Sequence, residues 1–156
     1  MKVTSTAIQN GIISDKYGKF GLYFDEDMPT YSLPFQIDDA PIGTQSFAVI
    51  LDDKDAIEVA GFVWIHWLIA NLTVNSVPSG VSTDETFVLT QGLNSWHKPC
   101  YGGMAPPNKP HTYDLIVYAL DTVLPLQNGF TIEQLKYAME GHILAQAQTQ
   151  GIYRNK

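Results

Sequence analysis

Short apolar runs, separated by proline and glycine residues, recur along the chain. The breaks come about every 8–12 residues over long stretches, which is the spacing of an all-β sandwich or barrel. The run over residues 47–51 is apolar on both faces of a pleated strand, so it predicts a central strand covered on both sides. The whole pattern predicts strands over residues 19–24, 45–52, 62–71, 87–90 and 113–120.

One clear helix is predicted near the end of the chain. Thr131 and Gln134 fit a capping box, in which the hydroxyl and the amide each bond to the other residue's backbone N–H. Apolar residues then recur at helical spacing to near Gln148, and Gly151 can end the helix. We therefore expect an all-β domain with this C-terminal helix packed on it and few other, short helices.

Length and composition describe one soluble globular domain. The chain has 156 residues, 45% of them apolar and 16% charged, and it contains no internal repeat or linker. A single domain over residues 1–156 is therefore expected. The formal charge is −7 and the nine basic residues are scattered. This argues against a nucleic-acid partner and against attachment to anionic membranes, because both need a concentrated positive field.

Sequence features also indicate in which cellular compartment the protein is expected. The first residues lack the apolar core of a signal peptide, and no run approaches the roughly 18 apolar residues of a transmembrane segment. The only cysteine, Cys100, excludes an internal disulfide and is interpreted as an inert thiol. We expect a cytoplasmic protein, with a processed form of a secreted chain as the alternative.

Two polar clusters lie at the ends of apolar runs. Asp53 and Asp55 come just after the central strand, where they could orient a histidine or bind an amine or a metal. Trp64 and His66 are two residues apart, so on a strand they face the same side. The alternatives are an acidic turn that satisfies local backbone N–H groups, and a core histidine bonded to a backbone carbonyl.

A third cluster repeats this spacing. His111 and Tyr113 are again two residues apart at the start of a predicted strand. The loop over residues 101–107 combines flexible glycines with the stiff Pro106-Pro107 pair, so its backbone could approach a ligand beside a fixed wall. An ordinary structural loop is the alternative. Together the three clusters predict one small ligand pocket, assembled by long-range contacts.

In their order along the chain, these clusters resemble a known family. The order is Asp-x-Asp-Ala, Trp-x-His-Trp, Asn-Ser, Tyr-x-Gly-x-x-Pro-Pro and His-x-Tyr. It resembles the phosphatidylethanolamine-binding protein family, and within it the bacterial branch often called Raf-kinase-inhibitor-like. The similarity covers roughly residues 41–154. Each motif is short, but their order and spacing together are specific.

The resemblance implies a Greek-key β-sandwich with a shallow, anion-accepting pocket. It implies a ligand-binding role for ten residues: a polar floor of Asp53, Asp55, His66 and His111, and walls of Trp64, Gly103, Ala105, Pro106, Pro107 and Tyr113. Four residues depart from the family pattern: Lys54, Ile57 and Met104, where the family usually has proline, and Thr112, where it tends to have arginine. These departures bear on affinity and ligand identity, not on the fold.

The leading functional hypothesis is a non-catalytic binding protein, without a cofactor, for a small anionic or phosphorylated group such as a phospholipid head group. A role as regulator or inhibitor of another protein is compatible with it. No nucleophile motif such as Gly-x-Ser-x-Gly occurs. We expect weak binding, on the order of a millimolar. It should be strongest below a histidine pKa of about 6.5, because a bound anion favours protonated histidines.

Two other functions stay open. One is a metal-assisted hydrolase with His66, His111 and either Asp53 or Asp55 as ligands, although their spacing matches no standard zinc signature. The other is an interaction domain with a vestigial pocket, which Ile57, Met104 and Thr112 would explain. The natural ligand, a protein partner and the oligomeric state, including a homodimer, are also open.

Overall fold

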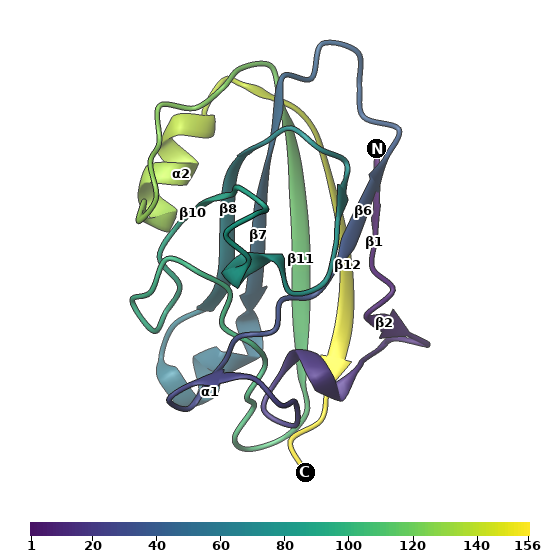
Figure 1. The fold of residues 1–156 in the computed structure, drawn as a ribbon, viewed down its shortest axis with the longest axis vertical. Helices are drawn as coiled ribbons and strands as arrows, with labels where there is room; N and C mark the ends of the chain where they lie inside the picture. Colours follow the sequence, from purple (N-terminus) through teal and green to yellow (C-terminus); the bar gives the residue numbers. More distant parts are fainter.

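A seven-stranded sheet forms the centre of the computed structural model, which describes residues 1–156 (Figure 1). In spatial order its strands are β10 (Thr90–Gln91), β8 (Trp64–Leu72), β7 (Ser46–Asp53), β11 (His111–Leu120), β12 (Ile143–Tyr153), β3 (Ile12–Ile13) and β2 (Ile8–Gln9). All neighbours are antiparallel except β12 and β3. β7, β8 and β10 lie in chain order and β11 returns beside β7, which is a Greek-key order.

A smaller sheet packs on one face of this sheet and makes the fold a sandwich. Its strands are β1 (Lys2–Thr4), β6 (Phe35–Asp38) and β9 (Ser76–Val77), and β4 (Phe24–Asp25) pairs separately with β5 (Met28–Pro29). Ile37 and Val77 of the small sheet share one apolar core with Val49, Trp67 and Val117 of the large sheet. The predicted β-sandwich is therefore confirmed.

The other face of the large sheet is covered by a helix. Leu135 and Met139 of α2 (Ile132–Met139) pack on Ala48, Ile50 and Leu68 in a second apolar cluster. Because both faces of the sheet are covered, every residue of β7 is buried. This confirms the central strand that the continuous apolar run predicts.

The predicted strands are confirmed in the centre of the sheet and wrong at its margins. Residues 45–52, 62–71 and 113–120 correspond to the neighbouring strands β7, β8 and β11. Residues 19–24 form mainly a bend, where the Gly21 N–H donates to the Gly18 carbonyl at 2.8 Å, and only Phe24 joins a strand. Of residues 87–90 only Thr90 is in a strand, because a turn at Asp84 holds the Phe87 N–H at 3.1 Å.

The capping box is confirmed, but the predicted extent of the helix is wrong. Thr131 Oγ1 accepts from the Gln134 N–H at 3.1 Å, and Gln134 Oε1 accepts from the Thr131 N–H at 2.9 Å. The helix ends at Met139, and Gly141, with φ of 78°, turns the chain back. Residues 143–153 form β12, which pairs with β11 along its length.

The remaining helices are short. They are α1 (Ile57–Ala60) and the 3-10 helices η1 (Asp15–Tyr17), η2 (Lys54–Ala56) and η3 (Val81–Thr83). α1 follows β7 and lies at the opposite end of the large sheet from α2 (Figure 1). None of the helices has the length and apolar content needed to cross a membrane.

Candidate functional site

Three strand ends bring the polar clusters together. β7 ends at Asp53, opposite Trp64 at the start of β8, and Asp114 near the start of β11 lies opposite Asp52. Here they border a cavity of about 260 Å3. Its lining is Asp53, Ala56, Val59, Ala60, Trp64, His66, Trp96, Ala105, Pro106, Pro107, His111 and Tyr113. Of the ten residues with an expected ligand-binding role, all but Asp55 and Gly103 line this cavity.

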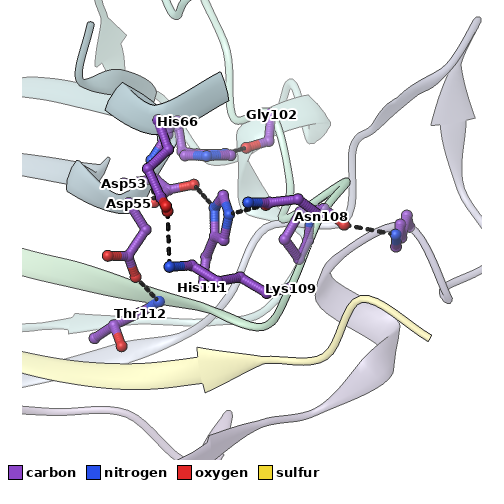
Figure 2. Close-up of polar contacts among 12 residues, drawn as sticks. Asp53, Asp55, His66, Gly102, Asn108, Lys109, His111 and Thr112 are labelled. Carbon is purple, nitrogen blue, oxygen red and sulfur yellow. Dashed lines mark hydrogen bonds and ion pairs between the residues drawn. The ribbon is translucent and has the colours of Figure 1, made fainter. Parts of the chain in front are cut away.

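His111 is fixed by Asp53. The Nδ1–H of His111 donates to Asp53 Oδ2 at 2.7 Å, and the two side chains are only 1% and 5% exposed. The other carboxylate oxygen, Oδ1, accepts from the Ala56 N–H at 3.2 Å. On the far side of the ring, Nε2 of His111 lies 2.7 Å from Oδ1 of Asn108 (Figure 2). Both ring nitrogens of His111 are therefore occupied.

His66 is a neutral acceptor near pH 7. Its Nδ1–H donates to the Gly102 carbonyl at 2.6 Å, which leaves Nε2 with a lone pair. Burial lowers the pKa of His66 to about 4, against the opposing effects of the Gly102 carbonyl and the Asp53 charge. The expected gain in affinity below about pH 6.5 therefore cannot come from protonation of His66.

Two hydrogen-bond donors of the cavity wall have no partner. They are Nε1 of Trp64 and the hydroxyl of Tyr113, and both atoms are buried. Burial, and after it the charge of Asp53, raises the pKa of Tyr113 far above the ordinary tyrosine range, so the hydroxyl keeps its proton. The Asp53 carboxylate is close enough to contribute to this shift, but it makes no hydrogen bond of good geometry with the hydroxyl. A buried donor without an acceptor costs about 1–3 kcal/mol, so a ligand oxygen at this place would recover free energy.

No lysine or arginine lines the cavity, and Asp53 is its one carboxylate. The nearby lysines have other partners: Lys54 is paired with Asp52 and Asp114, and Lys109 with Glu58. Most of the wall is apolar, with Trp96 and Pro106 among its members. The cavity therefore offers neutral donors and apolar contact area rather than a positive charge.

Asp55 and Gly103 have structural contacts instead of a place on the wall. Asp55 Oδ2 accepts from the Thr112 N–H at 2.8 Å and so ties η2 to the start of β11 (Figure 2). Gly103 donates its N–H to the Pro29 carbonyl at 2.8 Å, and a Cβ atom there would collide with Tyr17. Both residues support the cavity from outside.

The four departures from the family pattern also lie off the cavity wall. Met104 is fully buried in the larger core, and Ile57 is exposed at the start of α1. Lys54 joins two aspartates, and Thr112 offers its backbone N–H to Asp55. These residues therefore change the surroundings of the cavity and not its lining.

The sequence does not single out Trp96, Val59, Ala60 or Asn108 as site residues. Trp96 meets Trp64 edge-on, with ring centroids 5.2 Å apart, and also meets His66 at 5.5 Å. It follows directly on the Asn-Ser motif, which is the one sequence signal that could have pointed to it. Val59 and Ala60, which line the cavity, and Asn108, which contacts His111, carry no such signal, because only the fold brings them there.

The ligand set considered for a metal is not assembled. Asp55 is bonded to Thr112, and Nδ1 of His66 is a donor to a carbonyl. Nowhere do three or more His, Cys, Asp or Glu side chains form a group that could hold a metal ion. This geometry gives the hydrolase hypothesis no support.

Comparison with known proteins agrees with this arrangement. The family model described as "Phosphatidylethanolamine-binding protein" matches residues 4–154. The chain belongs to the phosphatidylethanolamine-binding protein family. A protein of Bacillus subtilis, YxkA, is 38% identical over 160 residues, which cover 93% of this chain and 95% of YxkA.

Two solved structures of phosphatidylethanolamine-binding protein relatives have the same fold. The homologue CT736 from Chlamydia trachomatis superposes with a TM-score of 0.85 at 34% identity, over 99% of this chain and 97% of the other. YbcL of Escherichia coli gives a TM-score of 0.84 at 29% identity, over 99% and 98%. The chain thus has the binding-protein fold of its family, and this fold is compatible with a small ligand.

Proposed function

We propose that this member of the phosphatidylethanolamine-binding protein family is a non-catalytic binding protein for a small anionic group. The group is a phosphate or a phosphorylated head group, held in the cavity between α1 and residues 105–107. The buried donors without partners, Trp64 Nε1–H and Tyr113 O–H, carry the proposal. A ligand whose oxygens accept from Trp64 Nε1–H and from Tyr113 O–H would satisfy two groups that the free protein leaves unpaired.

The charges near the cavity limit the affinity. Asp53 repels an incoming anion, and no cation of the wall offsets this. We therefore expect a dissociation constant on the order of 1 mM, or about −4 kcal/mol, with singly charged phosphoryl groups preferred over doubly charged ones. A non-catalytic role is favoured because the wall has no serine, threonine, cysteine or lysine that could act as a nucleophile. The unpaired thiol of Cys100 fits a reducing compartment such as the cytoplasm.

Tryptophan indole signals provide a direct test. The chain has three tryptophans, so the 15N-labelled protein gives three indole N–H resonances. Titration with inorganic phosphate, and separately with phosphoethanolamine, should move the Trp64 resonance as its N–H gains an acceptor. The Trp67 resonance should stay, because this indole already donates to Gln91 Oε1 at 2.7 Å. The Trp64→Phe variant assigns the signal.

A matched pair of tyrosine variants tests the second donor. Tyr113→Phe removes only the orphaned hydroxyl and should weaken phosphate binding. Tyr118→Phe, on the same strand but away from the cavity, should bind as the unaltered protein does. The proposal is wrong if the Trp64 resonance stays still at ligand concentrations about tenfold above the expected dissociation constant.

A further inference from the structure

His111, which lines the cavity, has a ring nitrogen that is already bonded to another side chain of the protein. Nε2 of His111 lies 2.7 Å from Oδ1 of Asn108. His111 is buried, whereas Asn108 is an exposed residue of the loop that precedes β11. The His111 ring lies between Asp53 and Asn108, so the two residues hold it from opposite sides (Figure 2).

Only one acceptor can use Nε2 of His111. Nδ1 of His111 faces a carboxylate oxygen of Asp53, which can only accept, so Nδ1 carries a hydrogen. Oδ1 of Asn108 lies opposite Nε2, where it accepts when Nε2 carries a hydrogen. A ligand oxygen needs the same hydrogen, so it reaches Nε2 only after the Asn108 side chain has left.

The Asn108 side chain is free to leave without moving the loop. Its contact with His111 is the only hydrogen bond that it makes. The loop is held independently on both sides of it. Lys19 Nζ donates to the Pro106 carbonyl at 2.8 Å, and Lys109 Nζ lies 2.7 Å from Glu58 Oε2 on α1.

We propose that Asn108 is a specificity-determining residue that competes with the ligand for Nε2 of His111. This inference rests on the proposed binding of an anion in the cavity. A neutral carbonyl or hydroxyl ligand gains nothing over the carboxamide that it must displace. An anionic oxygen makes a charge-assisted bond of roughly twice the strength, so it displaces Asn108 at a net gain. The residue thus selects phosphate-like and carboxylate-like groups over neutral ones.

Two substitutions of Asn108 with opposite expected effects test this competition. Asn108→Ala frees Nε2 and should tighten binding of inorganic phosphate by about two- to tenfold, the range of one exposed hydrogen bond. It should also let acetamide, a neutral carbonyl probe, bind at concentrations at which it does not bind the unaltered protein. Asn108→Asp places a carboxylate at Nε2 and should weaken phosphate binding. Pro110→Ala, which loosens the same loop without touching the carboxamide, is the control and should leave affinity unchanged.

A measurement without ligand checks the contact itself. The 15N resonance of His111 Nε2 should move in Asn108→Ala, while the resonances of His66 should not. If phosphate moves the Trp64 indole signal equally in both proteins and binds Asn108→Ala no more tightly, the inference falls and the proposed function stands. If phosphate moves that signal in neither protein, both fall. An unchanged affinity in Asn108→Asp also overturns the inference.

Discussion

Acid should destabilise the fold through one buried side chain, His66. This residue is 3% exposed, and burial lowers its pKa from 6.5 to about 4. As the pH falls below 6.5, the unfolded chain takes up a proton on His66 that the folded protein does not accept until about pH 4. The unfolded state therefore binds more protons in this window. The contribution of neutral His66 to the free energy of unfolding is complete above pH 6.5 and is lost progressively towards pH 4.

The size of this loss follows from the two pKa values. Between pKa 6.5 and about 4, one group contributes about 3 kcal/mol in total and about 2 kcal/mol by pH 4.5. Asp52 acts in the opposite direction, because burial raises its pKa and its folded form gains a proton first. A comparison of variants that share Asp52 removes its contribution.

Urea denaturation at pH 7 and at about pH 4.5 isolates the His66 contribution. In His66→Gln the side-chain amide can still donate to the Gly102 carbonyl but does not titrate. The unaltered protein should lose about 2 kcal/mol more than this variant between the two pH values. His97→Asn is the control, since this exposed imidazole makes no hydrogen bond and asparagine tolerates its φ of 63°. Equal losses in His66→Gln and in the unaltered protein would refute the reasoning.

Three substitutions test other parts of the structure. His111→Ala leaves the Asp53 carboxylate, 5% exposed, without its partner and should cost about 3 kcal/mol of unfolding free energy in urea; a loss below 1 kcal/mol contradicts this. Thr131→Ala removes the cap of α2 and should cost about 1 kcal/mol, while Thr73→Ala, which removes a hydroxyl without a hydrogen-bond partner, should cost little. Gly103→Ala should lower the thermal midpoint strongly, because the new Cβ meets the Tyr17 carbonyl; an unchanged midpoint would show that this contact can relax.

The centre of the fold is predictable from the sequence because its signals are local and strong. The continuous apolar run of β7 needs cover on both faces, and the capping box fixes where α2 begins. β12 is different, since alanine and glutamine alternate there and both favour a helix over a strand. Ile143 also continues the helical spacing of Met139. The apolar pattern therefore predicts a helix that runs past Gly141, whereas in the structure the helix ends at Met139.

The candidate site is predictable as a set of residues but not as a set of contacts. The motifs place Asp53, His66 and His111 at strand ends, and the structure brings these ends to one cavity. Whether a carboxylate faces the cavity or a backbone N–H depends on the turn that follows β7, which directs Asp55 to Thr112. Whether a donor such as the Trp64 indole N–H has a hydrogen-bond partner depends on all of its neighbours in space, and no short sequence motif predicts that.

The return of β11 to β7 has a consequence for how the protein folds. Asp53 and His111 are 58 positions apart, and they meet only when β11 has docked beside β7. The chain loses the entropy of closing this long loop before the paired strands stabilise it, so β-sandwiches fold slowly, in about milliseconds to seconds. A partly folded chain with only the β7–β8 hairpin lacks His111 and Tyr113, which β11 brings to the cavity wall, so we expect it not to bind. A ligand added during refolding should therefore stabilise molecules that have already folded, without raising the folding rate of the others.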